Sequence, residues 1–183
     1  MKETDLIKKT IIKNVFDLYK TKVVDADNNH RRPTLPYVTL KFITHQTSDG
    51  QAGNYSAEFI KAQDKKFKYD IKETLDYQPI ATLSVSATAE TESEARELAE
   101  HMHDYFKFVG RPKFESINTT IVTVGDIGNR TIGLADGITF DFKFGFDVAI
   151  RYLKVIERTS PNIEKWKAEG KLGDRKIETE GKI

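Results

Sequence analysis

The sequence contains few groups whose types and spacing could support catalysis or metal binding. His101 and His103 lie on one predicted helix at a spacing of two, so they point about 200° apart and cannot share a metal ion. Asp141 and Asp147 form the best candidate carboxylate pair. On one extended strand they lie roughly 20 Å apart, which is too far to share a proton. The glycine-rich segment 125–133 is followed by a predicted strand, not by the helix that a dinucleotide loop requires.

Other signatures of chemistry are missing from the 183 residues. The chain has no cysteine, no HExxH zinc motif, no GxSxG nucleophile elbow and no phosphate-binding P-loop. We therefore expect no catalytic residue, no cofactor and no metal, and we do not expect an enzyme. The net charge of +1 gives no argument for nucleic acid or membrane surfaces. The charged N-terminus lacks the apolar segment of a signal peptide, and no membrane span is predicted.

The residues that remain are organised around one long alternating segment, 137–152. Its even positions are apolar and include Phe140, Phe142, Phe144 and Phe146, whereas its odd positions are small or charged. This period of two predicts a strand with one buried face, about 50 Å long if it is unbroken. Gly145 is the expected place for a bulge or bend.

Two amphipathic helices are available to cover the apolar face of this strand. Residues 4–19 place Ile7, Ile11 and Val15 at helical spacing. Thr91 begins a capping box, and the helix that follows runs to about Val109 before Gly110. The apolar stripe of this second helix consists of Ala95, Leu98, Ala99, Met102, Tyr105, Phe106 and Val109.

Three further strands are predicted at 37–44, 80–89 and 119–126, and residues 57–76 are interpreted as an exposed hairpin or loop. The fold class is therefore α+β. We expect a two-layer sandwich whose mostly antiparallel sheet carries two helices on one face and a long C-terminal strand. We expect one domain at 1–160 and a charged C-terminal tail or short helix at 161–183.

The sheet's other face carries small, hydroxyl and mixed-charge residues, which can face water or a neighbouring subunit. Arg31 and Arg32 are the only adjacent arginines and could meet phosphate or a neighbour's carboxylates, although most such pairs are simply solvated. A long strand could also offer an edge to a neighbour by β-augmentation, a contact that can close a ring. Trp166 either anchors in a partner or docks on its own domain. The candidate interface residues are Arg31, Arg32, Arg130, Asp141, Lys143, Asp147, Arg151 and Trp166.

The order of these elements resembles the neck or tail terminator family of tailed bacteriophages, of the tail-completion type found in phages of Gram-positive hosts. The resemblance covers residues 5–156. Its most telling pieces are Pro36-Tyr37-Val38-Thr39, Asn129-Arg130 and Phe144-Gly145-Phe146-Asp147-Val148.

The resemblance implies a structural virion protein of the tail or neck that is assembled in the host cytoplasm. Members form a hexameric ring that caps the tail tube, ends its polymerisation and joins it to the head-side connector. The implied partners are other copies of the chain, the tail tube protein, the connector or neck protein and, in contractile tails, the sheath. DNA passes through the ring without sequence reading, and no membrane is involved.

Two alternatives remain open at the level of the sequence. One is a head–tail joining or tail-completion adaptor of similar fold, and the other is a small α+β ligand- or nucleic-acid-binding domain.

Overall fold

The computed structural model describes residues 3–27, 33–47, 50, 52–65, 67–133, 140–162, 165–172 and 175–182. The chain divides into two compact units and passes between them more than once. Unit 1 comprises Met1–Gln51 and Gln78–Lys154, and unit 2 comprises Ala52–Tyr77 and Val155–Ile183. The expected domain boundary near residue 160 stays a prediction.

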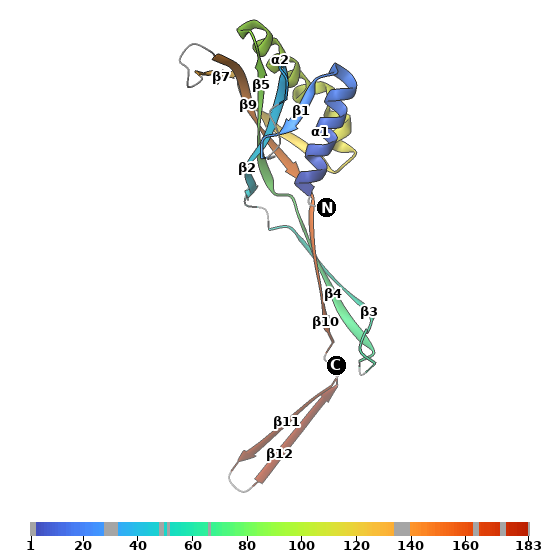
Figure 1. Cartoon of the computed structure of the whole chain (residues 1–183). Coiled ribbons are helices and arrows are strands. Elements are labelled where there is room, and N and C mark those ends of the chain that lie inside the picture. The colour runs from blue at the N-terminus through green and yellow to red at the C-terminus, as the bar shows by residue number, and fades with distance from the viewer. Residues whose placement is uncertain are drawn as a thin grey trace. The chain divides into compact units, whose positions relative to one another are not determined.

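Unit 1 is built on a sheet whose strands follow the order β1-β2-β5-β9-β6, with two short strands also paired to β9 (Figure 1). β1 and β2 run parallel, and the pairings of β9 with its neighbours are antiparallel, as is β2 with β5. The strands are β1 (Lys22–Asp25), β2 (Tyr37–Thr47), β5 (Ile80–Ala89), β6 (Thr119–Val124), β7 (Gly128–Asn129), β8 (Ile132–Gly133) and β9 (Phe140–Tyr152). The predicted mostly antiparallel sheet is confirmed.

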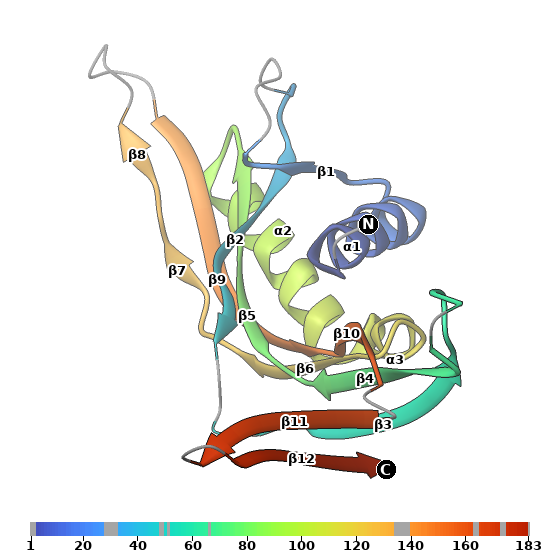
Figure 2. The same ribbon diagram turned by 90° about the horizontal axis from the view of Figure 1, so that it is seen from below.

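The helices of unit 1 lie on one side of this sheet, as Figure 2 shows for α1 and α2. They are α1 (Glu3–Tyr19), α2 (Glu92–Asp104), the π-helical segment η1 (Tyr105–Val109) and the short α3 (Arg111–Glu115). The Thr91 hydroxyl accepts a hydrogen bond from the Glu94 backbone N–H at 3.3 Å, as the predicted cap requires. The α+β fold with helices on one face is therefore confirmed.

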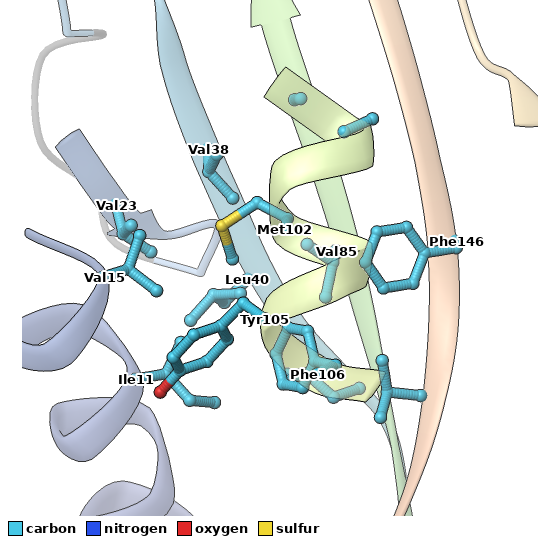
Figure 3. Close-up of a cluster of buried hydrophobic side chains, with 14 of the residues drawn as sticks. Ile11, Val15, Val23, Val38, Leu40, Val85, Met102, Tyr105, Phe106 and Phe146 are labelled. Carbon is cyan, nitrogen blue, oxygen red and sulfur yellow. The ribbon is translucent and has the colours of Figure 1, made fainter. Parts of the chain in front are cut away.

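The core lies between these two layers. Met102, Tyr105 and Phe106 from α2 and η1 pack toward Val85 of β5 and Phe146 of β9 (Figure 3). α1 contributes Ile7, Ile11 and Val15 from the other side of the cluster. On β9, Phe144, Phe146, Val148, Ile150 and Tyr152 are buried, so the predicted alternation of this strand is confirmed where it is described. Residues 137–139 of the predicted strand lie outside the described residues.

The end of the second helix differs from the prediction. The Gly110 backbone N–H donates to the carbonyl of Tyr105, five residues earlier, at 2.8 Å. This π-type bond inserts one extra residue into the turn and rotates the residues that follow it. Val109, expected in the apolar stripe, is consequently 43% exposed, and its neighbour Phe108 is exposed as well.

Unit 2 contains a three-stranded sheet of order β10-β4-β3 and a separate two-stranded hairpin of β11 and β12. The strands are β3 (Asn54–Lys61), β4 (Tyr69–Tyr77), β10 (Lys154–Pro161), β11 (Lys165–Leu172) and β12 (Arg175–Lys182). The expected exposed hairpin at 57–76 corresponds to β3 and β4. The expectation of a short helix after residue 161 is wrong, because β11 and β12 pair as antiparallel strands over eight residue pairs.

Candidate interface on the outer face of the sheet

The outer face of the unit 1 sheet is the side that the helices leave uncovered. β5 and β9 pair antiparallel, with Ser84 opposite Asp147 and Ser86 opposite Gly145. Residues directly opposite each other share a face of the sheet, so these positions gather on the polar side. The alternation of both strands thus places hydroxyls and a carboxylate in one patch.

Arg130 lies over this patch and binds both strands. Its Nη1 donates to Ser84 Oγ at 2.6 Å and to Ser86 Oγ at 3.3 Å. Its Nη2 donates to Asp147 Oδ1 at 2.9 Å, which makes the contact an ion pair. The planar guanidinium suits this arrangement because it presents several donors at fixed angles. We call Arg130, Ser84, Ser86 and Asp147 the arginine cluster.

The backbone around Arg130 holds the side chain in place. The Arg130 N–H donates to the carbonyl of Lys143 at 2.7 Å, beside the short pairing of β7 with β9. The Lys143 N–H in turn donates to Thr131 Oγ1 at 3.1 Å. Segment 128–131 is therefore tied to β9 on both sides of Arg130, which orients the guanidinium toward β5.

Gly145 makes room for the arginine cluster. A Cβ at this position would collide with the carbonyl oxygen of Val85, and it would lie 2.8 Å from Ser86 Oγ and 3.1 Å from Arg130 Nη1. No bulge occurs here, because the pairing of β5 with β9 continues through Ser86 and Gly145 without a register shift. The glycine serves close approach across the sheet.

The other predicted interface residues are distributed along the chain. Asp141 and Lys143 lie farther toward the start of β9 than Asp147 and are partly buried. Arg151 lies near the end of β9, where it lines a cavity of about 290 Å³ together with Asn118 and Thr120. Trp166 belongs to β11, and Arg31 and Arg32 lie outside the described residues. Of the predicted set, the structure joins Arg130 and Asp147 directly; an interface role for any member stays a prediction.

Unit 2 contains a second charged cluster that the sequence did not indicate. Arg158 donates from Nε to Glu73 Oε2 at 2.5 Å and from Nη2 to Oε1 at 2.8 Å. The Tyr55 hydroxyl donates to Glu73 Oε1 at 2.5 Å. The hydrogen bonds from Arg158 and then from Tyr55 lower the pKa of Glu73 to about 2. The alternation of Tyr55, Ala57 and Phe59 was a usable strand signal, but partners so distant in sequence could not be deduced from it.

In the part of the chain that the structure describes, no group of three or more histidine, aspartate or glutamate residues is arranged to hold a metal ion. Within the same ranges, no helix is long and apolar enough to cross a membrane.

The comparisons with known proteins identify the family. No curated protein matches the sequence. A family model described as phage neck terminator protein matches residues 4–174, which include both units apart from the chain ends. The arginine cluster lies inside this range, and its Arg130 and Asp147, together with the neighbouring Gly145, come from two of the segments that carried the resemblance. The chain therefore belongs to the phage neck terminator protein family.

Proposed function

We propose that the chain forms a hexameric ring that caps the finished tail tube, ends its polymerisation and joins the tube to the head-side connector. The observation that carries this proposal is the family match across residues 4–174. Neck terminator proteins are structural components of the phage tail and neck, so the partners are other tail or neck proteins and the location is the virion. The proposal goes beyond family membership in two respects. It gives the number of copies in the ring, and it places the action of the protein at the end of tube assembly.

The outer sheet face supports a role in recognition. The charges of the arginine cluster are largely satisfied within it, yet the Arg130 and Asp147 side chains keep 33% and 45% exposure. Such a preorganised polar surface can contact a tube subunit or a ring neighbour with little loss of side-chain entropy. We assign Arg130, Asp141, Lys143, Asp147 and Arg151 to this contact, and we assign Arg31, Arg32 and Trp166 to further contacts with partners. In contractile tails the sheath is a further partner.

DNA passage through the ring needs no base reading. The net charge of +1 on 183 residues gives no strong attraction to phosphate, which suits a lumen through which DNA must slide. Assembly in the host cytoplasm completes the proposal. The chain supplies shape and contacts at a tube end and carries out no chemical step.

Deletion of the gene from its phage tests this proposal. We expect overlong tails or tails without heads, counted by electron microscopy and restored by the wild-type gene supplied from a plasmid. Mass measurement of the protein on isolated tails is expected to give six copies at the tube end. Tails of normal length beside unjoined heads would contradict the terminator role and indicate a head–tail joining protein instead.

A further inference from the structure

The three-stranded sheet of unit 2 has two unlike faces. Register places Tyr55 opposite Leu75 and Phe59 opposite Ile71, and these positions form an apolar face around the Glu73–Arg158 pair. The opposite face is acidic. It carries Glu58, Asp70, Asp76 and Glu157 against a single base, Lys72, which pairs with Glu157 at 2.8 Å.

The apolar face is poorly covered by the rest of the chain. Tyr55 is 63% exposed and Phe59 is 67% exposed, although the Phe59 ring contacts that of Tyr69 with centroids 6.4 Å apart. β3 is the outermost strand of the order β10-β4-β3, so its outer edge offers backbone donors and acceptors. An exposed edge beside exposed aromatic rings favours the addition of another strand.

The β11–β12 hairpin has the same amphipathic pattern. Register places Trp166, Ala168, Gly170 and Leu172 on one face, opposite Gly181, Thr179, Ile177 and Arg175. The other face contains only charged positions, five lysines and three glutamates: Lys165, Lys167, Glu169, Lys171, Lys176, Glu178, Glu180 and Lys182. Among the described strands, β11 and β12 pair only with each other. A two-stranded hairpin is marginally stable by itself in water, so this one gains from a further strand.

The two elements complement each other in length and charge. β3 and β11 both contain eight residues. The charged face of the hairpin has an excess of lysine, concentrated on β11 at Lys165, Lys167 and Lys171, whereas the matching face of β3 itself carries one acid, Glu58, and no base. Opposite charges on neighbouring strands stabilise a sheet, as do aromatic neighbours. Placed beside β3, β11 would bring Trp166 to the face that holds Tyr55 and Phe59.

We propose that the β11–β12 hairpin of one copy adds to the edge of β3 in the next copy, with β11 next to β3. The contact joins two different surfaces of the chain, so repetition around an axis closes a ring. This inference rests on the proposed ring and names the contact that closes it. It also gives residues after 161 a function, and it makes Trp166 an anchor on a neighbouring copy.

Cross-linking tests this contact directly because the chain has no native cysteine. We combine Ser56→Cys on β3 with Lys167→Cys on β11 in one chain and treat assembled rings with a short bis-maleimide, since neighbouring strands lie about 4.8 Å apart. A ladder of covalent oligomers ending at the full ring is expected. A cross-linked product with the mass of a single chain would mean that the hairpin pairs with β3 of the same copy, and that result overturns the inference.

The matched control moves one cysteine to the other edge of the sheet. Thr159→Cys on β10, combined with Lys167→Cys, is expected to give about tenfold fewer covalent oligomers because the two sites are not held together. A second pair, Asn54→Cys with Lys165→Cys, keeps the register of the first pair and repeats the test if the first variant does not fold. Hexamers by mass without β3–β11 cross-links would overturn this contact and leave the ring intact. Finding a single copy of the protein at the end of each isolated tail would instead contradict the proposed ring.

Discussion

Both units contain strands in which apolar and polar residues alternate, but the apolar face is buried in unit 1 and largely exposed in unit 2. In unit 1, the alternation of β9 buries a row of aromatic and aliphatic side chains under α1 and α2, and Phe146 is 1% exposed. In unit 2, the alternation of β3 gives an apolar face too, but Phe59 is 67% exposed. Unit 1 is therefore stabilised from within, whereas unit 2 presents apolar surface suited to a partner. The difference separates the residues that hold the fold from those available for assembly.

Truncating one aromatic residue in each unit gives the largest expected contrast. Phe146→Ala should lower the free energy of unfolding by about 3–5 kcal/mol, because the change leaves a cavity in a packed core. Phe59→Ala should lower it by less than about 1 kcal/mol, since most of this ring already faces water. Urea denaturation followed by circular dichroism measures both. Equal losses would remove the distinction between the units.

Adding a methyl group at Gly145 tests the close packing of the outer face. Gly145→Ala should cost about 1–3 kcal/mol of unfolding free energy, because the new Cβ meets the Val85 carbonyl and Ser86 Oγ. Gly128→Ala is the matched control on the facing strand, where the nearest atom lies 3.9 Å away, and it should change stability by less than about 0.5 kcal/mol. A Gly145→Ala variant as stable as the control would show that the arginine cluster does not need this space.

Removing the cap of α2 should have a smaller effect confined to unit 1. Thr91→Ala removes the acceptor for the Glu94 N–H and should cost about 1 kcal/mol of unfolding free energy. Ser93→Ala, in the first turn of the same helix, changes a hydroxyl that does not occupy the cap position. Thermal unfolding compares the two variants, and a Ser93→Ala loss as large as that of Thr91→Ala would argue against capping as the cause.

The smallest effect on stability is expected from the exposed charge cluster of unit 2. We expect its clearest sign to be a Glu73 pKa of about 2, which NMR titration of the side-chain carboxyl carbon would measure. This pKa lies below the unfolded value of about 4.3, so the stabilisation is present above that value and is lost as pH falls toward 2. Arg158→Met should return the Glu73 pKa toward its ordinary range. An unchanged midpoint in that variant would mean that the arginine contact is not formed in solution.

The sequence was most informative where local signals agreed with one another. The capping box at Thr91 and the alternation of β5 and β9 predicted the helix start, the buried face and the polar face correctly. Features that depend on a single backbone bond were missed. The π turn that ends at Gly110 moved Val109 out of the core, and helical spacing carries no signal of such a bond.

The site was partly predictable for the same reason. Alternation placed Asp147 on the outer face, but it could not show that Arg130 reaches it across Gly145. Unit 2 was harder to predict because its strands come from two distant parts of the sequence, 54–77 and 154–161. The charges in these strands also weaken the hydrophobic pattern. Glu73 and Arg158 are 85 residues apart, and patterns within short segments do not predict which residues pair over such a separation.

Two of the connections between the units are very short in sequence. β4 ends at Tyr77 and β5 begins at Ile80, while β9 ends at Tyr152 and β10 begins at Lys154. These are two of the three crossings between the units, and they leave unit 1 at neighbouring positions because Ile80 pairs with Arg151. Tension that reaches β5 and β9 through them would be shared with β2 and β6 as shear along their hydrogen-bonded ladders. Connections this short can transmit force along the chain without first extending a slack loop.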